Sequence, residues 1–289
     1  MTRHENRGSR WFLRTAVVLG IAGLALAASL SGASEPSIVA LPSGARQTLV
    51  PPPAGIQAFH PGEALTYEVS WSGMFSAGTV TMTVETERLP DGREVLGFVV
   101  QGRTHGLMDT FYPVNDEVRS VFDPLLMQSL SYRLRESYGS KKRLRVTEFD
   151  HAKRTAVCRL NVDPAETLAT PDPVQDGLSL LYLLRTREDL ATGRRMDIDV
   201  VDSGRTWTVQ VSVLAREKVR TAAGEFDTIK TGITIHPRDA EGAPKRREAV
   251  LWLTDDGRKV PVLMKSTLRV GSFVFELVGL RPGTHAIRQ

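Results

Sequence analysis

The chain of 289 residues is 41% hydrophobic and 24% charged, which is typical of globular proteins and sufficient for one large or two ordinary domains. Its net charge of +4 is small and its basic residues are scattered, so the charge pattern indicates no nucleic-acid partner. The single cysteine, Cys158, excludes an intramolecular disulfide, and the alternation of apolar and polar residues around it predicts a small core side chain. The fold therefore has to be stabilised by packed sheet.

The N-terminus has the order of a secretory signal peptide. Four arginines precede an apolar stretch at 15–30, and Ser31-Gly32-Ala33 then places small residues at both positions that define a cleavage site. We predict a signal peptide of residues 1–33 with cleavage after Ala33, because the apolar stretch is short for a membrane span. An uncleaved inner-membrane anchor is the alternative. The Arg-, Ala- and Gly-rich composition is typical of bacteria, so we expect a periplasmic protein that contacts the membrane only through an uncleaved signal segment.

Three regions follow the signal. Residues 34–57 are rich in Pro, Ala, Gly and Ser and predict an extended linker. Residues 58–283 predict one folded domain, and residues 284–289 form a short tail. In the first half of the domain, apolar residues alternate with polar ones at the period of a half-buried strand. This pattern predicts strands at 65–71, 79–84, 95–100, 114–122, 130–135, 144–149 and 155–160.

The segment 176–186 breaks the strand pattern and predicts a helix. Asp176 is placed to act as its N-cap, and Arg185 lies near the end where the helix dipole favours a cation. Five leucines and Tyr182 leave no polar face, so the helix has to be covered, yet it is too short to span a bilayer. A curved sheet is the predicted cover. Because Arg185 ends a buried helix, its charge must be paired or must reach water.

After the helix the strand pattern resumes, with turn signals at 202–205 and 255–257. The predicted strands lie at 196–201, 206–213, 226–235, 249–253, 260–269 and 273–280. Sequential strands joined by short turns favour an antiparallel meander that curls to remove its exposed edges. The predicted fold class is therefore all-β, an antiparallel meander curled into a half-barrel or barrel, with one buried helix near 176–186.

Five segments stand out in chain order: GEALTYEVSWSGMFSAGTVTMTVE, FYPVNDEVRSVFDPLLMQSLSYRLRE, QDGLSLLYLLR, AAGEFDTIKTGI and LWLTDDGRKVPVLMKSTLRVGSF. Together they resemble the DUF3108 family of bacterial secreted proteins. The family has no established activity, so the resemblance implies no catalytic residues. The last third of the chain is also similar to periplasmic lipoprotein carriers, which implies a half-barrel with helices in its concave face.

The sequence offers no motif for catalysis, metal binding or a cofactor. Its histidines are scattered, it has no Gly-x-Ser-x-Gly elbow, and no glycine-rich phosphate loop follows a strand. We therefore expect no cofactor and assign no catalytic or metal-binding residue. A carboxylate pair for glycoside cleavage stays open, because its two acids can come from distant strands. The acids concerned are Asp109, Asp116, Glu117 and Glu136, and the alternative for each is a solvent-exposed strand face.

Aromatic and arginine side chains are the stronger indication of a site. Aromatics can line an apolar pocket in a concave sheet, and arginines can bind a carboxylate or phosphate head group. The alternative for each aromatic is core packing. The predicted ligand-binding residues are Trp71, Tyr112, Arg119, Tyr132, Arg185 and Trp252.

These features predict a non-catalytic periplasmic protein that binds a lipid-like or amphipathic envelope molecule, or an envelope protein. The alternatives are a hydrolase acting on an envelope glycan or ester, and a purely structural envelope protein. The helix distinguishes two of these hypotheses. If its leucines fill the concave face, the protein is a scaffold; if they form one wall with Arg185 at the rim, it is a binder.

Overall fold

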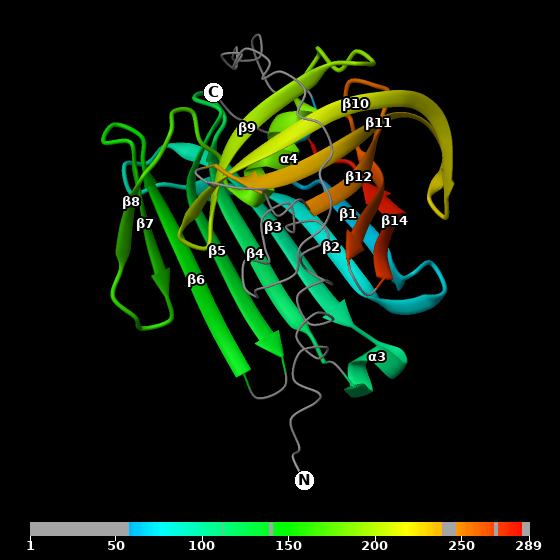
Figure 1. The fold of residues 1–289 in the computed structure, drawn as a ribbon, viewed down its shortest axis with the longest axis horizontal. Coiled ribbons are helices and arrows are strands. Elements are labelled where there is room, and N and C mark those ends of the chain that lie inside the picture. The colour runs from blue at the N-terminus through cyan, green and yellow to red at the C-terminus, as the bar shows by residue number, and fades with distance from the viewer. Residues whose placement is uncertain (1–57, 112, 139–140, 239–246, 269–270, 285–289) are drawn as a thin grey trace, which may run out of the picture.

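The computed structural model describes residues 58–284, except 112, 139–140, 239–246 and 269–270 (Figure 1). The predicted signal peptide with its cleavage site at Ala33, the predicted linker at 34–57 and residues 285–289 of the predicted tail lie outside the described residues.

Fourteen strands form one sheet, and each strand is antiparallel to its neighbours. The strands before the long helix are β1 (Ala64–Trp71), β2 (Phe75–Arg88), β3 (Glu94–Thr104), β4 (Asn115–Asp123), β5 (Gln128–Tyr138), β6 (Lys141–Asp150), β7 (Thr155–Leu160) and β8 (Glu166–Ala169). The strands after it are β9 (Arg195–Asp202), β10 (Arg205–Thr221), β11 (Gly224–Pro237), β12 (Arg247–Thr254), β13 (Pro261–Leu268) and β14 (Gly271–Arg281).

The two blocks of strands are joined through the first and last strands of the chain. β1 pairs with β2 on one side and with β14 on the other, so the order runs from β8 to β1 and then from β14 to β9. The sheet curls into an open half-barrel whose edges are β8 and β9 (Figure 1). The predicted fold class, a curled antiparallel meander with one buried helix, is confirmed.

The helix α4 (Gly177–Arg185) lies against the concave face of this sheet, which we call the inner face. All nine of its residues are buried. The ring of Tyr182 stacks on Phe98 of β3 with centroids 3.7 Å apart. Burial of a leucine side chain contributes about 1.5–3 kcal/mol, so the leucine run anchors the helix strongly to the sheet. The helix and its N-cap, Asp176, are where the sequence predicts them.

The helix covers only one end of the inner face. It starts beside Ser120 of β4 and finishes beside Glu63, just before β1. The other end of the half-barrel is where β1 and β3 end and where β4 and β6 begin. A second helix, α3 (Gly106–Phe111), connects β3 to β4 there (Figure 1). We call this the α3 end.

The segment before α4 covers the edge strand β9. The amide of Gln175 donates to the carbonyl of Asp199 at 3.0 Å, and the amide of Val201 donates to the carbonyl of Gln175 at 2.9 Å. Cys158 is buried in a small apolar cluster with Ala156, Val174 and Val201, as its sequence context predicts. The two edges of the sheet therefore approach each other through this segment.

Two elements of the structure have no counterpart in the sequence prediction. α3 has six residues, none of them buried, in a stretch where the sequence favours a loop. β8 has four residues and contributes no buried side chain, so no apolar alternation indicates it.

Candidate functional site

The N-cap of α4 is Asp176, whose buried carboxylate accepts hydrogen bonds from four donors. Asp176 Oδ1 accepts from the amides of Leu178 at 2.7 Å and Ser179 at 2.8 Å. Its Oδ2 accepts from the hydroxyl of Ser120 at 2.6 Å and from the hydroxyl of Ser129. Burial raises the pKa of Asp176, although these four hydrogen bonds oppose the shift. This carboxylate fixes α4 to β4 and β5.

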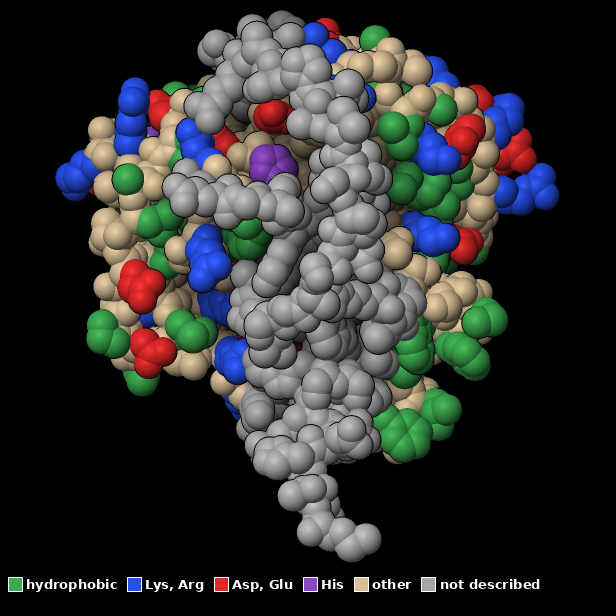
Figure 2. All heavy atoms as spheres, in the orientation of Figure 1, with side chains coloured by type: hydrophobic (Ala, Val, Ile, Leu, Met, Phe, Trp, Pro, Cys, Tyr) green, Lys and Arg blue, Asp and Glu red, His purple; other side chains and the backbone are tan. Residues whose placement is uncertain are grey.

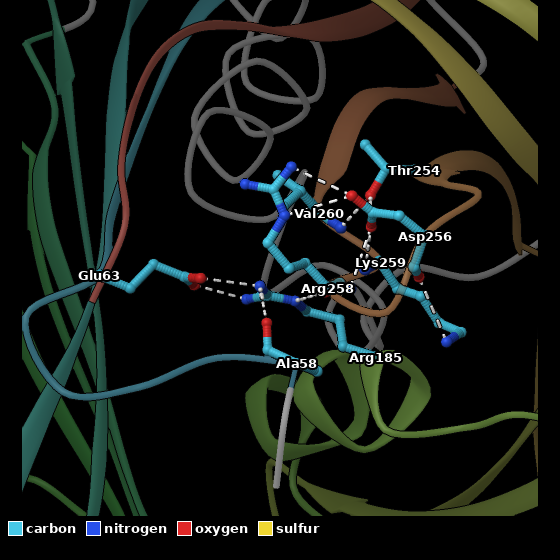
Figure 3. A network of polar contacts seen from close by, with 8 residues as sticks. All are labelled: Ala58, Glu63, Arg185, Thr254, Asp256, Arg258, Lys259 and Val260. Carbon is cyan, nitrogen blue, oxygen red and sulfur yellow. Dashed lines mark hydrogen bonds and ion pairs between the residues drawn. The ribbon is translucent and has the colours of Figure 1, made fainter. Parts of the chain in front are cut away.

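The other end of α4 is fixed by an ion pair. The guanidinium of Arg185 is fully buried and forms two hydrogen bonds with the carboxylate of Glu63, at 2.6 and 2.9 Å (Figure 3). It also donates to the carbonyls of Ala58 at 3.0 Å and Arg258 at 3.2 Å. Burial opposes the charge, but Glu63 outweighs this effect and raises the pKa of Arg185 above its usual value.

The turn between β12 and β13 presents one of these carbonyls. Asp256 accepts from the hydroxyl of Thr254 at 2.6 Å and from the amides of Arg258 and Lys259, both at 3.0 Å (Figure 3). This turn holds the carbonyl of Arg258 toward Arg185. The guanidinium is thus satisfied within the protein, and Arg185 lies inside the fold rather than at a rim.

A second polar group lies on the inner face around Tyr132 of β5. Burial raises the pKa of the Tyr132 phenol well above its usual value, and the nearby carboxylates of Asp202 and Asp176 raise it further. Burial also raises the pKa of Asp202 to about 7, against a hydrogen bond from Ser203 and the charge of Arg145. The turn between β9 and β10 therefore places a titratable acid inside the half-barrel.

The raised pKa of Asp202 predicts a pH dependence of stability. In the unfolded chain an aspartate ionises near pH 4, but in the fold Asp202 stays protonated up to about pH 7. Its stabilising contribution is therefore fully present below about pH 4 and is lost as the pH rises through 7. We expect Asp202→Asn, which cannot ionise, to remove on the order of 2 kcal/mol from the fall in unfolding free energy between pH 5 and 8.

Urea unfolding at both pH values measures this difference. The control is Asp227→Asn at an exposed position of the β10–β11 hairpin, where we expect the pH dependence of the wild type. An Asp202→Asn variant that loses as much stability with rising pH as the wild type would contradict the assignment.

At the α3 end, the inner face carries charged side chains on β4, β5 and β6. Asp116 and Glu136 are buried, and burial raises the pKa of Asp116 to about 7, with the amide of Ser137 opposing and Glu136 adding to the shift. Glu136 Oε2 forms no hydrogen bond and lies 3.6 Å from Arg145 Nη2. Arg143 lies directly opposite Glu136 in the register of β5 and β6.

The same end carries apolar side chains on β1, β2 and β14. Trp71 is half-buried at the end of β1 and has Phe75 and Phe273 as its cross-strand partners. Val69 and Val80, one step further in, are fully buried. Because directly opposed residues share a face of the sheet, these side chains point toward the inner face. We call the two groups together the mouth, which is apolar on one side and charged on the other.

The five predicted site residues that the structure describes are not brought together. Trp71 and Tyr132 lie on the inner face, whereas Arg185 is closed off by Glu63. Arg119 points to the outer face, where it pairs with Glu85 and Glu87 of β2. Trp252 also lies on the outer face, with its indole N–H donating to Glu217 at 2.6 Å and Lys230 over its ring. The remaining residue, Tyr112, lies outside the described residues.

Sequence reasoning missed three residues of this region. Glu63 lies in a turn segment and Asp202 at the end of β9 beside a turn, where an acid is ordinarily solvated, and nothing local indicates that either is buried. Arg145 lies in a predicted strand with other basic residues, and nothing in the sequence sets it apart from them. For Asp116 and Glu136 a signal does exist, because each shares the strand face of apolar residues such as Val118 and Leu134.

Comparison with known proteins places this half-barrel among β-barrel-like folds. A crystal structure of a β-barrel-like DUF1849 protein from Brucella abortus is 13% identical, with a TM-score of 0.53, and the match covers 76% of this chain and 97% of that one. A "putative lipoprotein" from Parabacteroides distasonis is 10% identical, with a TM-score of 0.33 and coverage of 77% and 97%. No curated protein sequence matches the chain.

The family assignment is direct. The profile of DUF3108, described as a protein of unknown function, matches residues 66–278, and the chain belongs to this family. The family resemblance of the sequence is thus confirmed. Neither α3 nor α4, the helices that the structure describes, has the length and hydrophobicity needed to cross a bilayer.

Proposed function

We propose that this protein is exported to the periplasm and binds an amphipathic, lipid-like molecule non-catalytically at the mouth. The observation that carries the proposal is the division of the mouth into two sides. Trp71 and its apolar neighbours on β1, β2 and β14 offer a surface for a hydrocarbon chain. Arg145 on β6 offers a positive charge for an anionic head group, with its Nη1 donating to the hydroxyl of Ser203 at 2.5 Å and its Nη2 3.6 Å from Glu136. The proposed export is supported by the N-terminal sequence.

The dimensions of the mouth suit such a ligand. From β1 to β6 the inner face crosses five strand spacings, an arc of about 24 Å. The hydrocarbon layer of one leaflet is roughly 15 Å thick, so a single acyl chain with its head group fits along this arc.

The position of α4 favours the mouth over the opposite end of the inner face. The helix and the Arg185–Glu63 pair occupy that end with buried leucines and a fully bonded guanidinium. A ligand there would have to displace α4, whereas at the mouth it meets the partly exposed Trp71 and Arg145. We therefore assign to Arg145 the binding of an anionic head group, which the sequence suggests for Arg185.

A fluorescent fatty acid tests the proposal. We expect dansyl-undecanoic acid to bind the purified protein, and Trp71→Glu, which puts a charge on the apolar side of the mouth, to weaken binding at least tenfold. The matched control is Thr81→Glu on the outer face of β2, which should bind like the wild type. Fluorescence titration measures both affinities. Equal weakening in both variants, or none in Trp71→Glu, would contradict the proposed site.

One observation favours a hydrolase as the second candidate. Asp116 and Glu136 are neighbouring buried acids on the inner face, and the pKa of Asp116 is raised to about 7, which suits a general acid. Binding is the better-supported function, because the carboxyl of Asp116 already accepts from the amide of Ser137 at 2.7 Å, whereas the mouth combines apolar side chains with a guanidinium. If the protein instead has a structural role or binds an envelope protein, the wild type should show no measurable affinity for the fatty acid.

A further inference from the structure

Four large apolar side chains are exposed beside the mouth, on two neighbouring connections. Met74 and Phe75 lie in and after the β1–β2 turn and are 75% and 60% exposed. Leu107 and Phe111 belong to α3 and are 75% and 64% exposed. α3 contacts β2, and hydrophobic side chains gather over both places in Figure 2. We call these four residues the apolar tip.

Hydrogen bonds hold both connections in place. In the β1–β2 turn, the amide of Met74 donates to the carbonyl of Trp71 at 3.1 Å, and the amide of Ser72 donates to the carbonyl of Ser272 at 2.6 Å. Around α3, the hydroxyl of Thr104 donates to Asp109 at 3.0 Å and accepts from the amide of Val114 at 2.8 Å. The exposure of the apolar tip is therefore built into the fold.

Among the described residues, acidic charge near the tip is confined to Asp109 of α3 and to Glu68 of β1, which accepts from the hydroxyl of Ser76 and lies 3.3 Å from His105. The stretch from Trp71 to Ser76 has no charged residue, and the only acid of α3, Asp109, is engaged by Thr104. The exposed Arg103 lies at the end of β3, just before α3. Apolar side chains on protruding connections, with a tryptophan at their base and a basic residue nearby, are suited to the interfacial layer of a membrane.

The shape of the tip favours lipid over a protein partner. The four side chains project from a turn and a short helix at one end of the sheet, not from a flat face or a groove. A protein partner would have to supply a matching pocket for each projection, whereas the fluid head-group layer accommodates separate projections without matching shape.

We propose that the apolar tip inserts into the head-group layer of a membrane and brings the mouth to the lipid surface. The purpose of this insertion rests on the proposed function: a lipid-like ligand has to enter or leave the mouth from a lipid phase, so docking at a membrane would serve its exchange. Insertion itself requires only the four side chains of the tip.

Vesicle flotation tests the insertion. The processed protein, exported from cells that express the complete chain, is mixed with vesicles of phosphatidylethanolamine and phosphatidylglycerol. We expect the double variant Met74→Ser/Leu107→Ser to lower the bound fraction at least tenfold. The control variant Leu125→Ser/Leu126→Ser changes two exposed leucines at the β4–β5 turn, at the opposite end of the half-barrel, and should bind within twofold of the wild type.

Each outcome decides the proposal. Unchanged flotation of the tip variant, or an equal loss in the control, would overturn it. If the tip variant floats normally but light scattering shows that it alone loses self-association, the tip is an interface between copies and the proposal is wrong. Fatty-acid affinity in solution reports separately on the mouth: if it is retained by the tip variant and lost in Trp71→Glu while flotation is unchanged, insertion fails and the proposed function stands.

Discussion

We expect Arg185→Met to lower the free energy of unfolding by about 3–5 kcal/mol, because it leaves the carboxylate of Glu63 buried without its partner. The carbonyls of Ala58 and Arg258 lose a donor in the same step. Glu63→Leu should cost a similar amount for the converse reason. The double variant, in which both charges are absent, should recover most of the loss, since apolar groups can fill the space of a buried ion pair. Urea denaturation followed by circular dichroism measures all three.

A surface ion pair provides the control for this cycle. Arg88 and Glu94 form a hydrogen-bonded pair at 3.0 Å, but their side chains are 73% and 41% exposed. Solvent screening makes such a pair worth less than about 1 kcal/mol, so Arg88→Met should have little effect. If Arg185→Met destabilised the protein no more than Arg88→Met, the buried pair would not be an anchor of α4.

The second large effect is expected at the other end of the helix. Asp176→Ala removes the N-cap and leaves the buried hydroxyls of Ser120 and Ser129 without their acceptor. Loss of a cap costs about 0.5–2 kcal/mol and each of the two unsatisfied hydroxyls about 1–3 kcal/mol, so a total of about 2.5–8 kcal/mol is expected. Asp176→Asn keeps one acceptor oxygen for the helix amides and should cost less than half as much.

Thermal and urea unfolding of both variants check this order. The serines offer an internal test, because Ser120→Ala combined with Asp176→Ala removes one of the orphaned hydroxyls and should be less destabilising than Asp176→Ala alone. Equal stability of Asp176→Ala and Asp176→Asn would show that the carboxylate does not organise the cluster.

The sequence predicts α4 well because the signals for it are local. A capping residue at Asp176, an apolar run and a terminal arginine lie within ten residues of each other. The strands are predicted for the same reason, since alternation along each strand records which face is buried. The pairing of β1 with β14 leaves no such local record, because it depends on how the whole sheet curls.

The candidate site is predicted less well because its residues come from distant strands. Arg185 requires a partner, but Glu63 lies 122 positions away and nothing in the sequence links the two. Arg119 alternates with the buried Val118 and Ser120, so its outward direction is readable from the sequence. Trp252 lies in a continuous apolar run, where alternation gives no direction. α3 is too short and too exposed to produce a helical pattern.

The most direct test of a lipid-binding mouth is native mass spectrometry of the protein purified without detergent from the cells that produce it naturally. We expect a bound species of lipid mass that stays with the wild type and is missing from Trp71→Glu. Spectra that show only ligand-free protein in repeated preparations, also after incubation with lipid extracted from the same cells, would contradict it.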